Sequence, residues 1–496
     1  MKRRLRDWAP LVGLWLVVTA YYVFVISAGT FKTWHVWSAF YDAQAQALLN
    51  GHLYLPEPPS RTLLSLADPL NIANMPHWRW DHALYGGHLH MYWGLVPAFI
   101  AAAVKALVHP AGVPDNSLTF AFCVIRLVAG TLLIRAVARA VSPRPPRWAV
   151  ALAMVVFALA NPTPYTLARA GIYEAAIMGG AAFILAGLYL GHRALTARGA
   201  LAATAWLATA SLSFGLAGGS RLSLIPAVAA LAMLAGLWRW RQARRLHADG
   251  KQHALAPGLA ALLPAGAIGV GLLITNYLRF GSLFEFGHSY TMTFPYFVGS
   301  LRFLAPDVFA YGIAPPDFTC WFPYVSAPWN TIRVSTPGWL PLNWPADHFS
   351  IEPSIGLLVA TPFVALAGIA GVVAIGRARI TSASLSAIGW INWLSVALVV
   401  WVLGAVPMWI LNVTTMRYQQ DFASALLLLA IVGGWRLLAA PQSRRGRLAM
   451  AWIYGGLAVV TIVAGVLLGF TGYFKHFDQH NPALMRALVA KLSFCR

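Results

Sequence analysis

The sequence predicts an all-α polytopic membrane protein with about eleven transmembrane helices. Of its 496 residues, 59% are hydrophobic and 10% are charged, whereas about a quarter of the residues of a soluble protein carry charge. The mean hydropathy is +0.64. The chain has 36 Lys+Arg against 15 Asp+Glu, and its basic residues recur in every second connection between apolar runs, as in membrane proteins generally. We therefore attribute the positive charge to membrane topology and expect no nucleic-acid partner.

Eleven apolar runs approach the length of about 20 residues that a membrane-spanning helix needs. They lie at 9–28, 117–135, 148–162, 174–192, 200–217, 222–239, 257–277, 354–376, 384–404, 422–438 and 449–470. The first run follows a basic start and shows no small-residue cleavage site, so we expect a retained helix rather than a signal peptide.

The connections between these runs predict the orientation of the chain. Basic residues gather at 2–6, 135–147, 193–198, 239–251, 377–379 and 444–447. If all eleven runs cross the membrane, these connections share one side, which by the positive-inside tendency is the cytoplasmic side. We therefore expect a multi-pass inner-membrane protein with a cytoplasmic N-terminus and with its large loops on the outer, periplasmic side. Four basic residues on the outer side are exceptions to this pattern: Lys475, Arg486, Lys491 and Arg496.

One further apolar run, Tyr92 to Val108, is predicted to lie in the membrane surface instead of crossing it. If it crossed, the basic connection at 135–147 would move to the outer side, against the positive-inside tendency. Pro97 and Lys105 within the run are also unusual in a lipid-facing helix. Upstream, the segment 36–49 has apolar residues near helical spacing, a pattern typical of an amphipathic helix on a bilayer.

The same pattern divides the chain into four parts. Residues 1–278 form an N-terminal transmembrane module with a first outer loop at 29–116, residues 279–353 an outer cap, residues 354–470 the C-terminal helices, and residues 471–496 an outer tail. The cap is too aromatic for a solvated tail, so we expect it to fold against the first loop. The three cysteines lack CxxC spacing, and we predict neither a disulfide framework nor a zinc site from Cys123, Cys320 and Cys495.

The polar stretch 34–94 of the first outer loop is the predicted reaction chamber. It holds four of the 15 acidic residues of the chain, together with six histidines. Since Asp and Glu contribute little to membrane orientation, their concentration in one loop needs another cause, and chemistry at the membrane face is the one we favour.

Several motifs resemble those of the GT-C superfamily of integral-membrane glycosyltransferases. The in-plane segment DAQAQALLNG, the start YWGLVP of the second in-plane run and the number of spans match the architecture of that superfamily. A group of bacterial membrane proteins assigned to it is similar in the motifs DPLNIAN, DHALYGGHLHMYWGLVPA, NYLRFGSLFEFGHSY and RYQQDF.

The superfamily includes protein mannosyltransferases and aminoarabinose transferases, which use polyprenyl-phosphate sugars. The resemblance implies transfer of a sugar from a polyprenyl-phosphate donor to an outward-facing glycan, lipid or protein. This sequence departs from better-known members at one place, because TWHVW at 33–37 stands where they carry an acidic pair.

An inverting transfer needs a carboxylate that takes the proton of the acceptor hydroxyl. The candidates are Asp42 on the in-plane helix, Asp81 before the ALYGG turn, and Asp68, which precedes Pro69 and so lies in an extended or turn conformation. The alternative for each is a solvated loop carboxylate or a structural partner of a basic side chain.

Cations must stabilise the leaving phosphate, and guanidinium suits this because it donates two parallel hydrogen bonds and stays charged. The candidates are Arg221 in GGSRLS, Arg279 in NYLRFGS and Arg417 in MRYQQDF, with Glu285 as a further acidic residue near the donor. The alternative is arginine that reaches for lipid headgroups. Arg126 lies deep in its span and is expected to have a structural partner, for which we name Glu174.

Aromatic and histidine side chains of the first loop complete the candidate site. Trp80, Tyr85 and Trp93 are candidates for stacking on sugar rings, although an interfacial aromatic belt explains them equally well. No HExxH or comparable spacing occurs, so we assign no metal or other cofactor; a divalent metal stays open, with His88 and His90 as weak candidates.

Two other functions remain alternatives. A transporter or flippase of a lipid-linked saccharide would show inverted repeats and ionisable groups near the bilayer midplane, whereas no repeat is visible and the acidic residues lie in loops. A non-catalytic assembly protein that binds a partner through its outer loops also stays open. The predicted partners are a polyprenyl-phosphate-linked sugar, an acceptor and membrane lipids.

Overall fold

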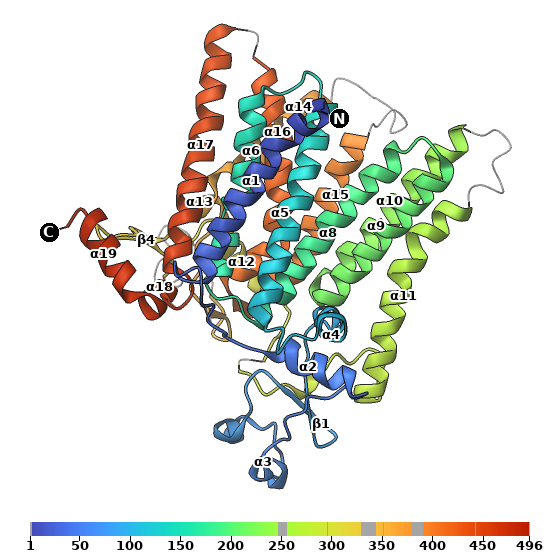
Figure 1. Ribbon diagram of the computed structural model, residues 1–496, viewed down its shortest axis with the longest axis vertical. Helices are drawn as coiled ribbons and strands as arrows, with labels where there is room; N and C mark the ends of the chain where they lie inside the picture. Colours follow the sequence, from blue (N-terminus) through green and yellow to red (C-terminus); the bar gives the residue numbers. More distant parts are fainter. Residues whose placement is uncertain are drawn as a thin grey trace.

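The computed structural model is a bundle of long helices with its polar loops gathered at one end (Figure 1). The structure describes residues 2–246, 255–294, 296–328, 344–350, 352–378, 390–441 and 443–495. Within these residues, nine helical stretches are long and apolar enough to cross a membrane, and the predicted all-α membrane fold is confirmed. The long helices are α1 (Lys2–Ile26), α5 (Asp115–Ala140), α6 (Arg147–Leu159) with α7 (Thr163–Leu167), α8 (Ile172–Thr196), α9 (Ala200–Ser220), α10 (Ile225–Leu246), α11 (Leu255–Phe280), α16 (Gln420–Ala439) and α17 (Arg444–Thr471).

Three shorter apolar helices accompany these nine in the described part of the chain. Two of them, α14 (Ala365–Ala378) and α15 (Trp390–Gly404), overlap the predicted spans 354–376 and 384–404, and residues 384–389 of the second span lie outside the described residues. The third is α4 (Val96–Val108), the run predicted to lie in the membrane surface. Nine of the eleven predicted spans therefore correspond to a long apolar helix, and the other two overlap shorter apolar helices in the described part of the chain.

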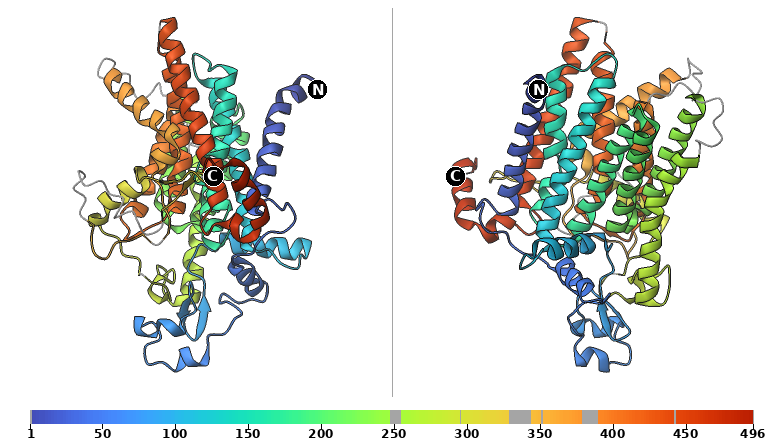
Figure 2. Two further views of the ribbon diagram at one scale, coloured as in Figure 1. Left: turned by 90° about the vertical axis from the view of Figure 1, so that its left-hand side faces the viewer. Right: turned by 45° about the vertical axis from the view of Figure 1, so that its right-hand side comes forward.

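Helices α2 (Phe40–Leu49) and α4 lie across the end of the bundle and pack on each other (Figures 1 and 2). The predicted amphipathic helix at 36–49 begins only at Phe40 because the buried Asp115 carboxylate accepts the backbone N–H groups of Phe40 and Tyr41 at 3.1 and 3.0 Å. The N-terminal start of α5 thereby fixes where α2 begins.

Helix α8 lies at the centre of the bundle and α11 at its edge. In α8, 72% of the apolar window is buried, against 6% in α11. Helix α8 packs against both α5 and α9, while α11 leans on α9 and α10. Side chains at the two ends of α8 are therefore held between neighbouring helices.

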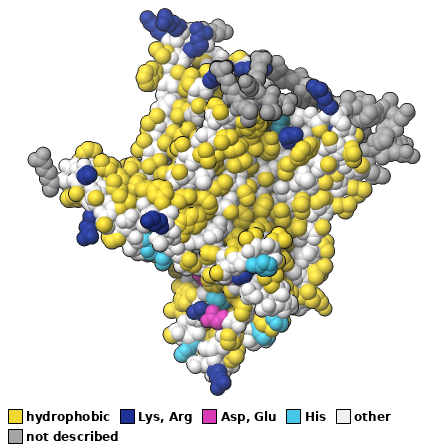
Figure 3. Space-filling model, viewed as in Figure 1, with side chains coloured by type: hydrophobic (Ala, Val, Ile, Leu, Met, Phe, Trp, Pro, Cys, Tyr) yellow, Lys and Arg dark blue, Asp and Glu magenta, His cyan; other side chains and the backbone are white. Residues whose placement is uncertain are grey.

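Three of the basic connections lie at the opposite end of the bundle from the polar loops; those predicted at 239–251 and 377–379 lie partly outside the described residues. The turns α5–α6, α8–α9 and α16–α17 are at the end that also holds the N-terminus (Figure 1). On the face drawn in Figure 3, the acidic side chains appear only at the polar-loop end. The three described basic connections therefore share one end of the bundle, as predicted.

Short elements build the polar-loop end. The first outer loop contains α3 (Arg61–Ser65), the 3₁₀ turn η1 (Ile72–His77) and an antiparallel hairpin of β1 (Ala83–Tyr85) and β2 (His88–His90), in which Leu84 faces Leu89. The other elements are η2 (Leu222–Leu224), η3 (His288–Tyr290), η4 (Leu301–Phe303), α12 (Leu304–Gly312), β3 (Asp317–Phe318), β4 (Val325–Ser326), β5 (Phe349–Ser350), α13 (Leu357–Ala360), η5 (Pro362–Val364), η7 (Val406–Trp409), β6 (Val413–Thr414), η8 (Met416–Gln419), α18 (His476–His480) and α19 (Pro482–Leu492). Strands β3 and β4 pair antiparallel, and β5 pairs in parallel with β6. This last pair joins the cap to the chain just before α16.

The prediction that the cysteines form no disulfide is wrong. Cys320 of the cap and Cys495 of the tail are bonded, with 5.5 Å between their Cα atoms, while Cys123 is free and buried. Local spacing could not indicate this pair, because 175 residues separate the two cysteines. The bond fastens the tail to the cap.

Labelling of introduced cysteines tests the orientation of the bundle. Arg61 begins α3 at the polar-loop end of the bundle, and Arg144 lies in the turn between α5 and α6 at the other end. Both are exposed. We expect a membrane-impermeant maleimide to label Arg61→Cys on intact cells and Arg144→Cys only after permeabilisation. Background labelling should be low because the native cysteines are buried or bonded. If only Arg144→Cys were labelled on intact cells, the orientation of the bundle would be the opposite of the one expected.

Candidate functional site

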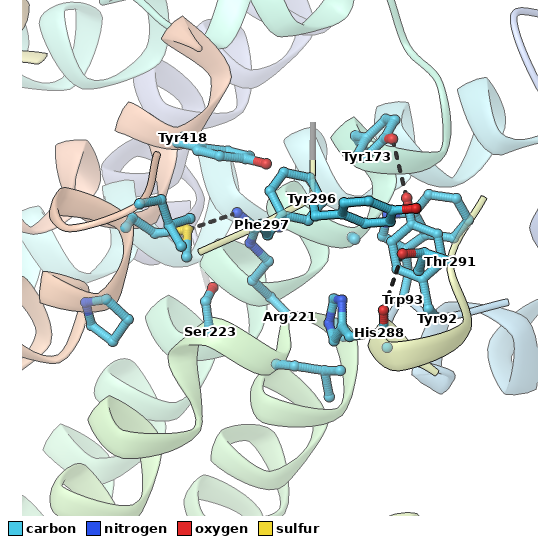
Figure 4. Close-up of a pocket in the computed structure, with 17 residues that line it drawn as sticks. Tyr92, Trp93, Tyr173, Arg221, Ser223, His288, Thr291, Tyr296, Phe297 and Tyr418 are labelled. Atoms are coloured by element: carbon cyan, nitrogen blue, oxygen red, sulfur yellow. Dashed lines mark hydrogen bonds between the residues drawn. The ribbon is translucent and has the colours of Figure 1, made fainter. Parts of the chain in front are cut away.

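A cavity of about 360 Å³ lies where the ends of α8 and α9 meet the cap and the chain that leads into α4 (Figure 4). Six of its 17 described lining residues are Trp, Tyr or Phe, one is arginine and none is a carboxylate. The lining residues are Tyr92, Trp93, Gly94, Tyr173, Ala176, Ser220, Arg221, Leu222, Ser223, His288, Thr291, Tyr296, Phe297, Pro407, Met408, Leu411 and Tyr418. We take this cavity as the candidate site.

Gly94 allows the chain before α4 to lie directly on the end of α9. A Cβ atom at this position would come within 2.3 Å of the Gly219 carbonyl oxygen, so any larger residue would push the two segments apart. The close approach brings Tyr92 and Trp93 into the cavity wall. Their rings stack with centroids 4.1 Å apart, and the Trp93 ring meets Tyr173 edge-on at 5.2 Å.

Arg221 is the basic residue of the cavity and follows α9 directly. Its Nη2 and Nε atoms donate to the buried Asp421 carboxylate at 2.9 and 3.1 Å. The third guanidinium nitrogen, Nη1, has no hydrogen-bond partner in the part of the chain that the structure describes. In Figure 4 the side chain points into the cavity between Ser223 and His288. Asp421 thus fixes the direction of Arg221 and leaves one N–H edge for a ligand.

Asp81 stands immediately behind the tyrosines of the cavity wall. Tyr173 donates its hydroxyl to Asp81 Oδ1 at 2.5 Å, and Tyr92 does so at 3.4 Å. Asp81 has a φ of +62°, and its backbone N–H donates to the Met292 carbonyl of the cap at 3.3 Å. Left-handed non-glycine residues are uncommon and cluster at functional sites.

The Asp81 charge also acts on the protonation of Tyr92. Burial, followed by the nearby Asp81 carboxylate, raises the pKa of Tyr92 well above its usual value. The Tyr92 hydroxyl therefore stays protonated at neutral pH and remains a hydrogen-bond donor to Asp81.

Four charged side chains beneath the cavity form what we call the ionic cluster, made of Arg169, Glu174, Glu352 and Arg417. Arg417 contacts Glu352 at 2.7 Å and Glu174 at 3.4 Å, and Arg169 contacts the same two acids at 3.4 and 3.5 Å. Glu174, Glu352 and Arg417 are each at most 5% exposed. The Arg417 guanidinium lies 3.9 Å from the centroid of the Tyr173 ring, so the cluster supports the tyrosine that donates to Asp81.

The predicted acidic residues do not gather at one place. Asp42 pairs with Lys105 at 2.7 Å and accepts the Val113 N–H at 2.6 Å, which joins α2 to α4. Asp68 is exposed and accepts the backbone N–H two residues on. Glu285 closes its own turn by accepting from Ser289 Oγ at 2.6 Å. Of the three base candidates, only Asp81 is bonded to side chains of the cavity wall.

The predicted arginines are also separated. Arg221 lines the cavity and Arg417 belongs to the ionic cluster, whereas the buried Arg279 donates to the Met91 carbonyl and packs on the adjacent Phe280 ring. The three therefore do not converge on one point.

The proposed pairing of Arg126 with Glu174 is wrong. Arg126 donates instead to Ser424 Oγ at 3.0 Å and to the Phe157 carbonyl at 3.2 Å. Glu174 is already held by the two arginines of the ionic cluster.

Of the three predicted aromatic residues, one lines the cavity and two lie elsewhere. Trp93 lines the cavity. Tyr85 packs between Phe280 and Tyr290, with ring centroids 5.6 and 4.6 Å away, and Trp80 is 47% exposed. Only Trp93 is therefore placed to stack on a ligand in this cavity.

The two histidines of β2 do not face each other across a metal site. His88 stacks on Tyr54 at 4.0 Å, and burial, followed by the Arg279 charge, lowers the pKa of the buried His90 to about 4. Across the residues that the structure describes, no group of three or more His, Cys, Asp or Glu side chains is arranged to hold a metal ion.

Sequence reasoning missed Tyr173, Asp421 and Glu352. A usable signal existed for the first two, because Glu174 beside Tyr173 and Asp421 in RYQQDF are acidic residues within apolar runs, and such residues need partners. Glu352 gave no such signal, because it comes from a loop that is distant in sequence.

Removing one acid of the ionic cluster tests its structural role. We expect Glu352→Gln to lower the free energy of unfolding by about 3 kcal/mol, since a buried arginine loses charge compensation. The measurement is denaturant unfolding in micelles. The control is Glu57→Gln, which breaks the half-exposed pair with Arg79 and should change stability by less than about 1 kcal/mol. Equal effects of the two variants would contradict this role.

No family model and no curated protein matches this chain. Among solved structures, the chain is similar to an oligosaccharyltransferase from Archaeoglobus fulgidus tethered with an acceptor peptide, with a TM-score of 0.46, 11% identity, and coverage of 93% of this chain and 55% of that one. It is also similar to ArnT from Cupriavidus metallidurans bound to undecaprenyl phosphate, with a TM-score of 0.44, 11% identity, and coverage of 97% and 79%. The chain thus spans little more than half the length of the oligosaccharyltransferase.

Proposed function

We propose that this protein is a membrane glycosyltransferase that moves a sugar from a polyprenyl-phosphate donor to an acceptor at the polar-loop end of the bundle. The observation that carries the proposal is that one cavity joins the open N–H edge of Arg221 to the tyrosines bonded to Asp81. A phosphate ligand and a carboxylate base are the two groups that such a transfer needs.

Arg221 and the start of the next helix form the phosphate end of the cavity. Leu222 and Ser223, which line it, are the first residues of η2, and η2 continues directly into the 22-residue helix α10. The N-terminus of a helix favours an anion because its first N–H groups are unpaired and the helix dipole is positive there. A phosphate beside Arg221 Nη1 would receive both contributions.

The size and lining of the cavity favour a single sugar. Ligand pockets usually enclose about 300–1,000 Å³, so a cavity of about 360 Å³ is at the small end of this range. The Trp93 ring offers an apolar face for a sugar ring, while Thr291 and His288 add polar contacts. One sugar with its phosphate fits this space better than an oligosaccharide.

In the proposed reaction, the acceptor hydroxyl oxygen attacks the anomeric carbon and forms the new glycosidic bond. The Tyr173 hydroxyl accepts the proton of the acceptor and passes its own proton to Asp81 along the 2.5 Å hydrogen bond. The bond between the anomeric carbon and the phosphate oxygen breaks, its electron pair stays on the polyprenyl phosphate, and Arg221 stabilises that charge. Arg417, which lies over the Tyr173 ring, holds the relay in place.

The disulfide supports an outward-facing site. Cys320 and Cys495 lie in the cap and the tail, and disulfides persist in oxidising compartments such as the periplasm. This agrees with the orientation expected from the basic connections, in which the cavity end of an inner-membrane protein faces the periplasm.

Asp81→Asn tests the general base. We expect turnover to fall at least about a hundredfold, the usual contribution of general base catalysis, because the amide cannot accept the relayed proton. The measurement is release of polyprenyl phosphate from a panel of synthetic polyprenyl-phosphate hexoses in native membranes. Asp68→Asn, an exposed acid of the same loop, is the matched control and should retain activity. Full activity of Asp81→Asn would refute the assignment.

Arg221→Gln tests the phosphate site separately from the chemistry. We expect binding of a short-chain polyprenyl phosphate to the purified protein to weaken about tenfold, the usual effect of losing one hydrogen bond to a charged group. Arg302→Gln removes a half-exposed arginine of the cap and serves as control. Unchanged affinity in Arg221→Gln would place the phosphate elsewhere.

A further inference from the structure

A second polar cavity, of about 420 Å³, lies at the other end of the bundle between α1, α5 and α8. Three arginines line it, Arg135 and Arg139 from α5 and Arg193 from α8, together with Trp8 of α1. It is separate from the cavity proposed for sugar transfer, and no step of that reaction uses it.

The cavity lies where lipid headgroups meet the protein. Trp8 stands near the start of the apolar part of α1, and the arginines belong to the last turns of α5 and α8. Tryptophan at this depth is typical of the membrane–water interface. All three helices therefore present their interfacial ends to the same space.

Two of the three lining arginines, Arg139 and Arg193, carry charge into the cavity from different helices. Neither Arg139 nor Arg193 has a carboxylate within 4 Å in the described part of the chain, and the described lining holds no Asp or Glu. The Arg193 guanidinium lies 4.6 Å from the Trp206 ring centroid, and that of Arg135 lies 4.2 Å from the Trp8 ring. These rings orient the guanidinium groups and leave their positive charge in place.

A row of apolar side chains leads away from the cavity along α1. Trp8, Val12 and Leu16 follow at four-residue spacing on one face of the helix and are 40%, 42% and 67% exposed. This row offers a path for an acyl chain whose headgroup sits among the arginines. A free phosphate ion would use only the charged part of the site.

We propose that this cavity binds the phosphodiester headgroup of an anionic phospholipid from the leaflet at the basic end of the bundle. Arginine snorkelling to bulk headgroups explains single side chains that point outward. It does not explain why arginines from two helices surround one cavity that also adjoins an apolar row. Basic pockets between transmembrane helices at this end are the known setting for bound anionic lipids.

Native mass spectrometry of the full-length protein tests this proposal. The protein is taken from nanodiscs of phosphatidylglycerol and phosphatidylcholine, and retained lipids are counted. We expect one phosphatidylglycerol to remain on the wild type and its affinity to fall at least about tenfold in the double variant Arg139→Gln, Arg193→Gln, since two charge-assisted hydrogen-bonding groups are lost. The double variant Arg198→Gln, Arg447→Gln removes the same charge from the same end outside the cavity and should bind like the wild type.

Two further arms separate the possible sources of the phosphate. Arg139→Lys, Arg193→Lys keeps the charge and should keep most of the preference for phosphatidylglycerol, which guards against loss through misfolding. Inorganic phosphate should not displace the bound lipid. Equal loss in both glutamine double variants, displacement by inorganic phosphate, or preferential retention of added polyprenyl phosphate would each overturn the proposal.

Discussion

The buried ionic cluster is the constraint on which the polar end of the molecule depends. Glu352 comes from the cap, Glu174 from the start of α8 and Arg417 from η8, and each is at most 5% exposed. Removing one partner of a buried pair costs about 3–5 kcal/mol, because the remaining charge is left uncompensated. The arrangement of the cap on the spans that pairs the two acids with the two arginines is therefore strongly favoured. Stability and the shape of the cavity are set by the same contacts.

Tyr173 connects this structural cluster to the proposed chemistry. One face of its ring lies against the Arg417 guanidinium, and its hydroxyl donates to Asp81. The same short stretch of chain controls the other end of the cavity, since Asp421 follows Arg417 by one helical turn and holds Arg221. A single helical turn that joins η8 to α16 thus contacts both Tyr173, which donates to the proposed base, and Arg221, the proposed phosphate-binding arginine, although neither of its own charged groups is the proposed base.

Local properties of the sequence predicted the fold well and the site only in part. Hydropathy and basic connections are read within one segment, so the spans and the in-plane position of α4 could be derived. Contacts between segments that are distant in sequence could not be derived in this way. Lys105 was noted only as unusual in an apolar run, yet it is the residue that pairs with Asp42. The bond between Cys320 and Cys495 was not predicted for the same reason, because 175 residues separate the two cysteines.

The two ends of the bundle handle charge in opposite ways, and this difference bears on function. At the cavity end, Arg221, Arg169 and Arg417 each contact buried carboxylates, so a ligand there meets directed hydrogen bonds more than net charge. At the basic end, Arg139 and Arg193 have no carboxylate neighbour among the described residues, so attraction is less selective and long in range. The proposed transfer gains from the first arrangement, because an excess of positive charge would retain a charged product such as polyprenyl phosphate. The proposed binding of an anionic lipid at the basic end gains from the second arrangement, in which the charge of these two arginines is not compensated by a described carboxylate.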